Sequence, residues 1–107
     1  MKILCVCHSG NVRSVALARL LRKRGHESIG VGIKQTTLLP LLCDWAERIY
    51  PMDFEVGGQL SAQGYGTKLR SDYMVGPDDW KQPDHPDLLR RLRDLVESRP
   101  VEPLEPA

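Results

Sequence analysis

The chain has few aromatic residues, few cysteines and no long apolar run. Only 6% of its 107 residues are aromatic, and its three cysteines stand at positions 5, 7 and 43. Three cysteines make no even disulfide framework and, with no secretory signal at the start, predict a reduced, cytoplasmic compartment. No apolar stretch approaches the roughly 18 residues of a membrane-spanning helix, so no membrane partner is expected.

The chain also lacks a strong charge of either sign. Its formal net charge is +1, which predicts no nucleic-acid partner. Four bases do cluster at Arg19, Arg22, Lys23 and Arg24. On a helix they would form a solvated outer face, or they could help to attract an anionic substrate. The two cysteines at positions 5 and 7 are poorly spaced for zinc and no second ligand pair follows, so neither a metal nor a cofactor is expected.

Length and composition favour one domain. A chain of 107 residues with 41% hydrophobic residues can bury an ordinary core. We expect a single domain over residues 1–98, followed by a proline-rich, flexible tail over 99–107.

Hydrophobic periodicity predicts an α/β fold, in which a four-stranded parallel sheet is flanked by helices. A strand at 2–6, a helix at 14–24 and a strand at 28–32 form a right-handed βαβ unit. The later elements are a helix at about 38–47 capped by Thr37, a strand at 48–52, a short helix and loop within 53–66 and a strand at 67–75. A last helix follows, capped by Asp84 or His85, with Pro86 in its first turn.

The segment between the first strand and the first helix is the most informative. The strand ends in Cys7, a short loop follows, and Arg13 and Ser14 open the helical pattern. A helix N-terminus has unpaired N–H groups and partial positive charge, so the loop can wrap around a phosphate. Nearby cations lower a thiol pKa from roughly 8.5 to as little as 3.5–7.5, and the arginine fork matches two phosphate oxygens.

We therefore predict Cys7 as a nucleophile and Arg13 as a phosphate binder. Glycine and asparagine tolerate the backbone conformations that such a loop requires. The predicted substrate-binding residues are His8, Ser9, Gly10, Asn11, Val12, Ser14 and Trp80. The bland alternative is that Cys7 is a small buried residue at a strand end and Arg13 an ordinary surface charge.

A second loop supplies candidates for a proton donor. Asp78 and Asp79 follow the predicted fourth strand, beside Trp80, and in a parallel sheet this loop can lie at the same edge as Cys7. The competing interpretation is that proline and aspartate simply form a turn here. Trp80, with Tyr73 or Tyr50, would favour an aromatic substrate.

With these motifs the chain resembles the low-molecular-weight protein tyrosine phosphatases. The resemblance rests on Cys7-x5-Arg13-Ser14 after an apolar strand, on the segment 44–49, and on Pro77-Asp78-Asp79-Trp80. It implies Cys7 as nucleophile, Arg13 as phosphate binder, Ser14 as stabiliser of the thiolate and Asp78 as general acid, with Asp79 competing for that role. The implied enzyme is a phosphomonoesterase that forms a phosphocysteine and binds phosphate or sulfate in its loop.

The implied substrate is a phosphorylated protein or a small aryl phosphate. Three other functions stay open. Arsenate reductases share the loop but need further thiols, for which only Cys5 and Cys43 are present. A phosphate carrier would hold the phosphocysteine for a partner, and an anion-binding module would lack turnover altogether.

Overall fold

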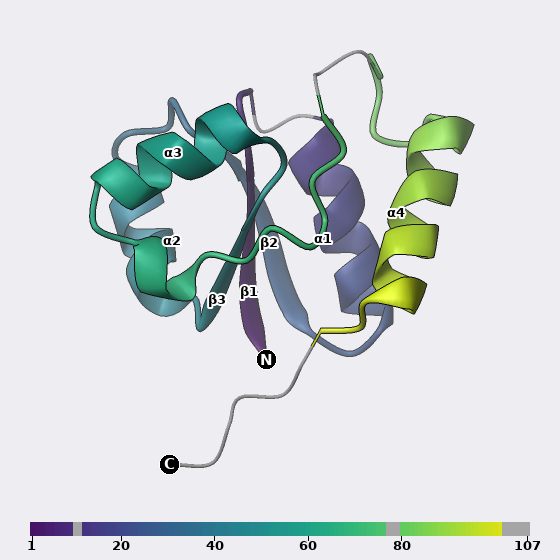
Figure 1. Cartoon of the computed structure of the whole chain (residues 1–107), viewed down its shortest axis with the longest axis horizontal. Coiled ribbons are helices and arrows are strands. Elements are labelled where there is room, and N and C mark those ends of the chain that lie inside the picture. The colour runs from purple at the N-terminus through teal and green to yellow at the C-terminus, as the bar shows by residue number, and fades with distance from the viewer. Residues whose placement is uncertain (10–11, 77–79, 102–107) are drawn as a thin grey trace.

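Three parallel strands form the sheet at the centre of the protein, in the order β2-β1-β3. The structure is a computed structural model, and it describes residues 1–9, 12–76 and 80–101. Helices lie on both sides of the sheet (Figure 1). The strands are β1 (Lys2–Cys7), β2 (Glu27–Gly32) and β3 (Arg48–Pro51), and the helices are α1 (Arg13–Lys23), α2 (Leu38–Trp45), α3 (Phe54–Ala62) and α4 (Pro86–Ser98). This arrangement confirms the α/β fold with a parallel sheet flanked by helices.

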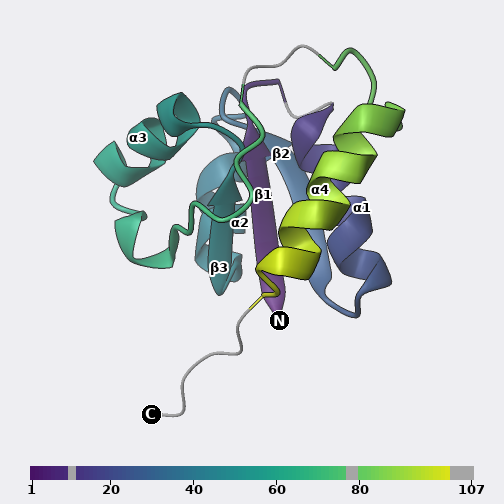
Figure 2. The same ribbon diagram turned by 45° about the vertical axis from the view of Figure 1, so that its right-hand side comes forward.

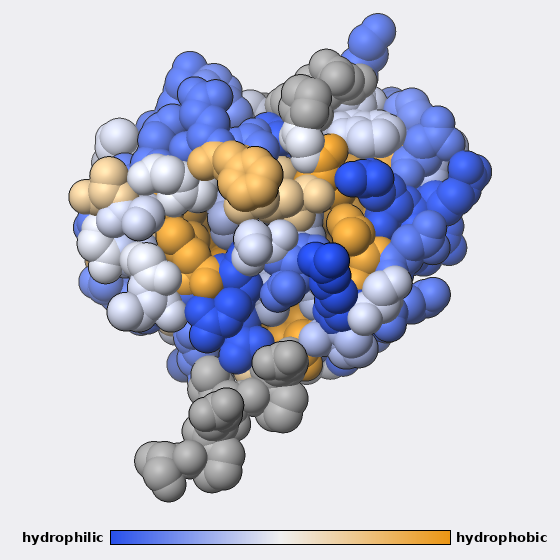
Figure 3. Space-filling model, viewed as in Figure 1, coloured by the Kyte–Doolittle hydropathy of each residue, from blue (hydrophilic) through white to orange (hydrophobic). Residues whose placement is uncertain are grey.

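Side chains of β1 alternate between two apolar cores. Ile3, Cys5 and Cys7 join the core under α1 and α4, whereas Leu4 and Val6 join the core under α2 and α3. The alternation follows from the two-residue period of a strand, and it explains why β1 is apolar from Ile3 to Cys7. Figure 2 shows α1 and α4 side by side on one face of the sheet and α3 on the other. On the face drawn in Figure 3, apolar side chains lie in separate areas among hydrophilic ones.

The predicted fourth strand at 67–75 is wrong. Residues Gly66–Lys68 form a short 3₁₀ helix, and the main chain of the segment that follows bonds to β3 near its start and to Met52, just after β3, near its end. The N–H of Arg70 donates to the carbonyl of Ile49 at 3.0 Å, and the N–H of Val75 donates to that of Met52 at 3.1 Å. Between these contacts the chain turns at residues 72–73 so that Tyr73 can bury its ring, which interrupts the ladder.

The helix starts differ in how they are capped. Of the two predicted caps for the last helix, His85 is the one observed: its Nδ1 accepts the N–H of Asp87 at 3.2 Å, and Pro86 lies in the first turn of α4, as predicted. Thr37 precedes α2, but its side chain makes no capping hydrogen bond because its own backbone is already helical. No described helix is long and apolar enough to span a membrane. Since α4 ends at Ser98, the predicted tail begins in the described residues and continues into 102–107, outside them.

Gly30 allows α1 to lie directly on β2. A Cβ at this position would come within 2.8 Å of the main-chain oxygen of Ser14, which is closer than real Cβ atoms approach. Because Ser14 belongs to the first turn of α1, the absence of a side chain at Gly30 sets how deeply the start of that helix sits in the molecule.

Candidate active site

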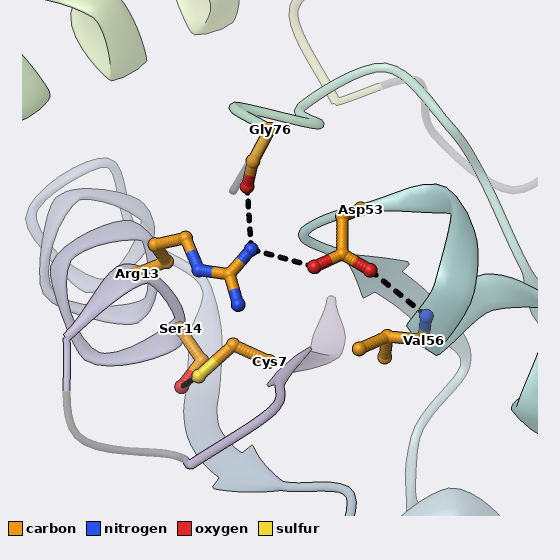
Figure 4. A network of polar contacts seen from close by, with 6 residues as sticks. All are labelled: Cys7, Arg13, Ser14, Asp53, Val56 and Gly76. Atoms are coloured by element: carbon orange, nitrogen blue, oxygen red, sulfur yellow. Dashed lines mark hydrogen bonds and ion pairs between the residues drawn. The ribbon is translucent and has the colours of Figure 1, made fainter. Parts of the chain in front are cut away.

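Cys7 and Ser14 meet where β1 ends and α1 begins. The Sγ of Cys7 lies 3.1 Å from the Oγ of Ser14, and both residues are fully buried (Figure 4). The sulfur is therefore next to a hydroxyl group, and Cys7 also belongs to the apolar core under α1 and α4. A serine hydroxyl at this distance can donate a hydrogen bond to a thiolate, which stabilises the charged form of the thiol.

Arg13 is held over this pair by acceptors from two distant segments. Its Nη1 donates to Oδ2 of Asp53 at 2.7 Å and to the carbonyl oxygen of Gly76. The side chain of Arg13 is only 1% exposed, so it is not an ordinary surface charge. Figure 4 shows the guanidinium between these acceptors on one side and Cys7 with Ser14 on the other. Asp53 and Gly76 thus fix the guanidinium through the nitrogen that lies away from the sulfur.

Asp53 is a site residue that the sequence reasoning missed. It is the N-cap of α3, where its Oδ1 accepts the N–H of Val56 at 2.9 Å while Oδ2 pairs with Arg13. Burial acts to raise the pKa of Asp53, but the hydrogen bond from Val56 and the nearby guanidinium outweigh it, so the pKa lies below its usual value. The carboxylate is ionised at neutral pH and cannot serve as a proton donor.

A signal for Asp53 was present in the sequence. An aspartate directly before a helical segment is a favoured N-cap, and this one follows β3 at the ligand-binding edge of a parallel sheet. Gly76 gave a weaker signal, because a glycine before a proline indicates only a loop. In the structure Gly76 has a φ of 82°, a left-handed conformation that other residues adopt only with strain, and this conformation helps to aim its carbonyl at Arg13.

The start of α1 favours an anion. Among the described residues, the N-cap side chain makes no capping hydrogen bond and the first turn contains no acidic residue, so neither offsets the positive end of the helix. The N-cap residue is Val12, whose side chain is buried in the core, so that only its main chain could meet a ligand. His8 and Ser9 are exposed. Gly10 and Asn11 lie outside the described residues.

The predicted aromatic residues occupy different places. Tyr50 and Tyr73 are fully buried with ring centroids 4.5 Å apart, so they pack against each other and do not reach a substrate. Trp80 is half-buried, packs against the core under α1 and meets the ring of His85 edge-on at 5.5 Å. Its indole nitrogen is buried and has no hydrogen-bond partner among the described residues. Asp78 and Asp79 lie outside the described residues.

The other two cysteines are core residues. Burial raises the pKa of Cys5 to about 12, an effect that a contact with Ser28 partly offsets. Burial likewise raises the pKa of Cys43 to about 11. Both thiols are fully buried, and Cys43 belongs to the core on the opposite face of the sheet from Cys7. Within the described ranges, no group of three or more His, Cys, Asp or Glu is placed to hold a metal ion.

Comparison with known proteins identifies the fold. No protein-family model and no curated protein sequence matches this chain. Among solved structures, the YwlE arginine phosphatase from Geobacillus stearothermophilus is similar with a TM-score of 0.64 at 17% identity, over 90% of each chain. The tyrosine phosphatase Wzb from Escherichia coli K30, in complex with sulphate, is similar with a TM-score of 0.65 at 14% identity, over 90% of this chain and 93% of that one. A structure of Wzb in complex with phosphate is similar with a TM-score of 0.61 at 15% identity.

The chain therefore shares its fold with these small phosphatases over most of its length. At such low identity the likeness concerns the path of the backbone.

Proposed function

We propose that this chain is a cysteine-dependent phosphomonoesterase that acts through a phosphocysteine intermediate. The observation that carries the proposal is the position of the Cys7 sulfur, 3.1 Å from the hydroxyl of Ser14 and beneath a guanidinium that Asp53 holds in place. The nucleophile Cys7 comes from β1, and the thiolate stabiliser Ser14 and the phosphate binder Arg13 come from α1. The packing of α1 on the sheet sets the distance between these two elements. The likeness of the fold to tyrosine and arginine phosphatases supports the same assignment.

In the first step the thiolate of Cys7 attacks the phosphorus in line with the leaving oxygen. A sulfur–phosphorus bond forms and the phosphorus–oxygen bond to the organic group breaks. Arg13 and the positive end of α1 stabilise the charge on the equatorial oxygens, as preorganised electrostatics require. The leaving oxygen takes a proton from a general acid, for which Asp78 is the candidate, since the ionised Asp53 cannot supply one.

In the second step a water molecule attacks the phosphocysteine. The deprotonated Asp78 accepts a proton from that water, the sulfur–phosphorus bond breaks, and the thiolate of Cys7 leaves again. The hydroxyl of Ser14 stabilises this thiolate both as nucleophile and as leaving group. Inorganic phosphate is the second product, and no external reductant is consumed.

Two features disfavour the competing functions. A thiol relay of the kind arsenate reduction needs would have to use Cys5 or Cys43, and both are buried with raised pKa values. A phosphate carrier has no need of a buried arginine fixed above its cysteine, because hydrolysis of the phosphocysteine is what such a module must avoid. The buried Arg13 therefore favours a hydrolase.

We propose a phosphorylated protein as the natural substrate, with aryl phosphates as small surrogates. The decisive experiment measures phosphate release from an aryl phosphate, an alkyl phosphate and phosphoarginine by the intact chain and by Cys7→Ser. We expect turnover of the aryl phosphate by the intact chain and none by Cys7→Ser, which still binds inorganic phosphate in a calorimetric titration. Cys43→Ser makes the same chemical change in the other core and should retain turnover once its folding is verified.

The proposal fails if none of the three phosphates is hydrolysed, or if Cys7→Ser retains turnover. Comparable turnover of the alkyl ester would show that the enzyme has no preference for aryl phosphates. Faster turnover of phosphoarginine would show that phosphoarginine, and not an aryl phosphate, represents the substrate class. Asp78→Asn should lose activity most with poor leaving groups while it still binds phosphate. Asp79→Asn is its matched control, and the reverse result would exchange their roles.

A further inference from the structure

The basic cluster that the sequence places on α1 is divided by the structure into two pairs. Arg22 donates from Nη1 to the carbonyl oxygen of Ser28 at 2.7 Å, which ties α1 to β2. Arg24 forms an ion pair with Glu97 of α4 at 3.6 Å. These two bases therefore have structural partners, whereas Arg19 and Lys23 make no hydrogen bond or ion pair with any described residue.

Arg19 and Lys23 instead line a cavity of about 260 Å³ between α1 and α4. These two helices lie side by side in both ribbon views (Figures 1 and 2). Arg93 of α4 contributes a third positive side chain to the cavity, while Leu20 and Leu89 supply part of an apolar lining. The cavity thus combines an apolar surface with positively charged side chains.

The charge of this cavity favours an anionic occupant. Three positive side chains line it against one carboxylate, that of Asp84. Arg19 and Lys23 stand four residues apart on one helix, a spacing at which like charges repel and destabilise the helix. An acidic group between these cations would relieve that repulsion, and its attached carbon atoms would contact the apolar lining.

The cavity lies on the helix that begins at the candidate active site. At a rise of about 1.5 Å per residue, Arg19 is roughly 9 Å and Lys23 roughly 15 Å along α1 from Arg13. Pro83, which also lines the cavity, follows Trp80 by three residues. An extended peptide covers about 3.3 Å per residue, so a segment of three to five residues can span from the site to the cavity.

We propose that this cavity binds an acidic side chain of the protein substrate, three to five residues from the phosphorylated residue. The proposal rests on the proposed phosphatase function and specifies its substrate class. The occupant is a peptide because a single extended chain can bring the phosphate to Arg13 and a carboxylate to Arg19, Lys23 and Arg93. Arg19 and Lys23 then determine specificity and take no part in the chemistry.

The test compares two phosphopeptides that differ only by glutamate or glutamine at positions three to five from the phosphorylated residue. The variant Arg19→Gln/Lys23→Gln is compared with Lys2→Gln/Arg91→Gln, which removes the same charge from two exposed positions outside the cavity. We expect the intact chain and the control to prefer the acidic peptide by about 3-fold to 10-fold in kcat/KM, through KM. The cavity variant should treat both peptides alike and hydrolyse a small aryl phosphate at the normal rate.

Equal kcat/KM values for the two peptides with the intact chain would overturn the proposal. A similar loss in the control would also overturn it, since the preference would then reflect overall charge. If the intact chain hydrolyses no phosphate ester, the proposed function fails by itself, and docking is judged by the affinity of labelled peptides measured by fluorescence anisotropy. Tighter binding of the acidic peptide that disappears in the cavity variant would sustain the docking site, and equal binding would reject it.

Discussion

Replacing Asp53 by asparagine would test how the candidate site is assembled. The substitution removes the negative charge beside Arg13 but leaves an oxygen that can still accept the N–H of Val56 and cap α3. Asp53→Ala removes the charge and the cap together. The pair of variants therefore separates the contribution of the ion pair from that of helix capping.

The structure sets the size of the expected effect. Removing one partner of a fully buried ion pair costs roughly 3–5 kcal/mol, because the other charge stays buried. Arg13 is 1% exposed but Asp53 is 23% exposed, and the carbonyl of Gly76 still accepts from the same nitrogen. Solvent screening and this remaining acceptor reduce the expected loss for Asp53→Asn to about 1–3 kcal/mol. Asp53→Ala should lose about 1 kcal/mol more with its cap.

The loss should depend on pH in one direction. Because the folded-state pKa of Asp53 is lowered, its carboxylate stabilises the fold at pH values above its ordinary pKa of 3.8. That stabilisation disappears as the pH falls through the folded-state pKa, which lies below 3.8. The difference in stability between the intact chain and Asp53→Asn should thus be complete at pH 7 and become smaller in this acidic range.

Urea denaturation at pH 7 and at acidic pH measures both effects. Asp87→Asn is the matched control, since Asp87 pairs with Arg90 at 3.4 Å on the exposed surface of α4 and should change stability by less than about 0.5 kcal/mol. An Asp53→Asn variant as stable as the intact chain at pH 7 would refute the reasoning. A loss that stays constant with pH would show that the charge of Asp53 is not its source.

Two further predictions concern packing. Gly30→Ala should lower the free energy of unfolding by about 1–3 kcal/mol and weaken phosphate binding, because its Cβ displaces the first turn of α1. Gly58→Ala is the control, since a Cβ there meets nothing within 4 Å. Equal stability of the two variants would contradict this role of Gly30. Cys5 and Cys43 should react with a thiol reagent at pH 8 only after unfolding, since burial raises their pKa values to about 12 and 11. Rapid labelling of both thiols in the native protein, followed by mass spectrometry, would disprove that burial.

The first half of the fold could be predicted because its signals are local. The predicted strand at 2–6 corresponds to β1 (Lys2–Cys7), and the predicted helix at 14–24 to α1 (Arg13–Lys23). The strand at 28–32 lies within β2, whose residue Gly30 pairs with Cys5. Apolar runs of the right length and period, each ended by a turn or cap, determine these elements almost regardless of the rest of the chain.

The segment 67–75 could not be predicted in the same way. Its apolar residues fit a strand, yet Tyr73 packs its ring against Tyr50 of β3, and the main-chain hydrogen bonds to Ile49 and Met52 lie near the two ends of the segment. Burying an aromatic ring there competes with a regular ladder, and the outcome depends on the space that α4 and β3 leave. No pattern within nine residues contains that information.

What the sequence determined by itself is the order of a buried strand, a loop and a helix, with Cys7, Arg13 and Ser14 at the junction. Local periodicity and the chemistry of these three side chains are enough to suggest an anion site. Only the tertiary structure decided that Arg13 is held by Asp53 and Gly76, which stand 40 and 63 residues away. Residues so far apart become neighbours only because β1 and β3 are adjacent and end at the same edge of the sheet, a pairing that depends on the packing of the whole chain.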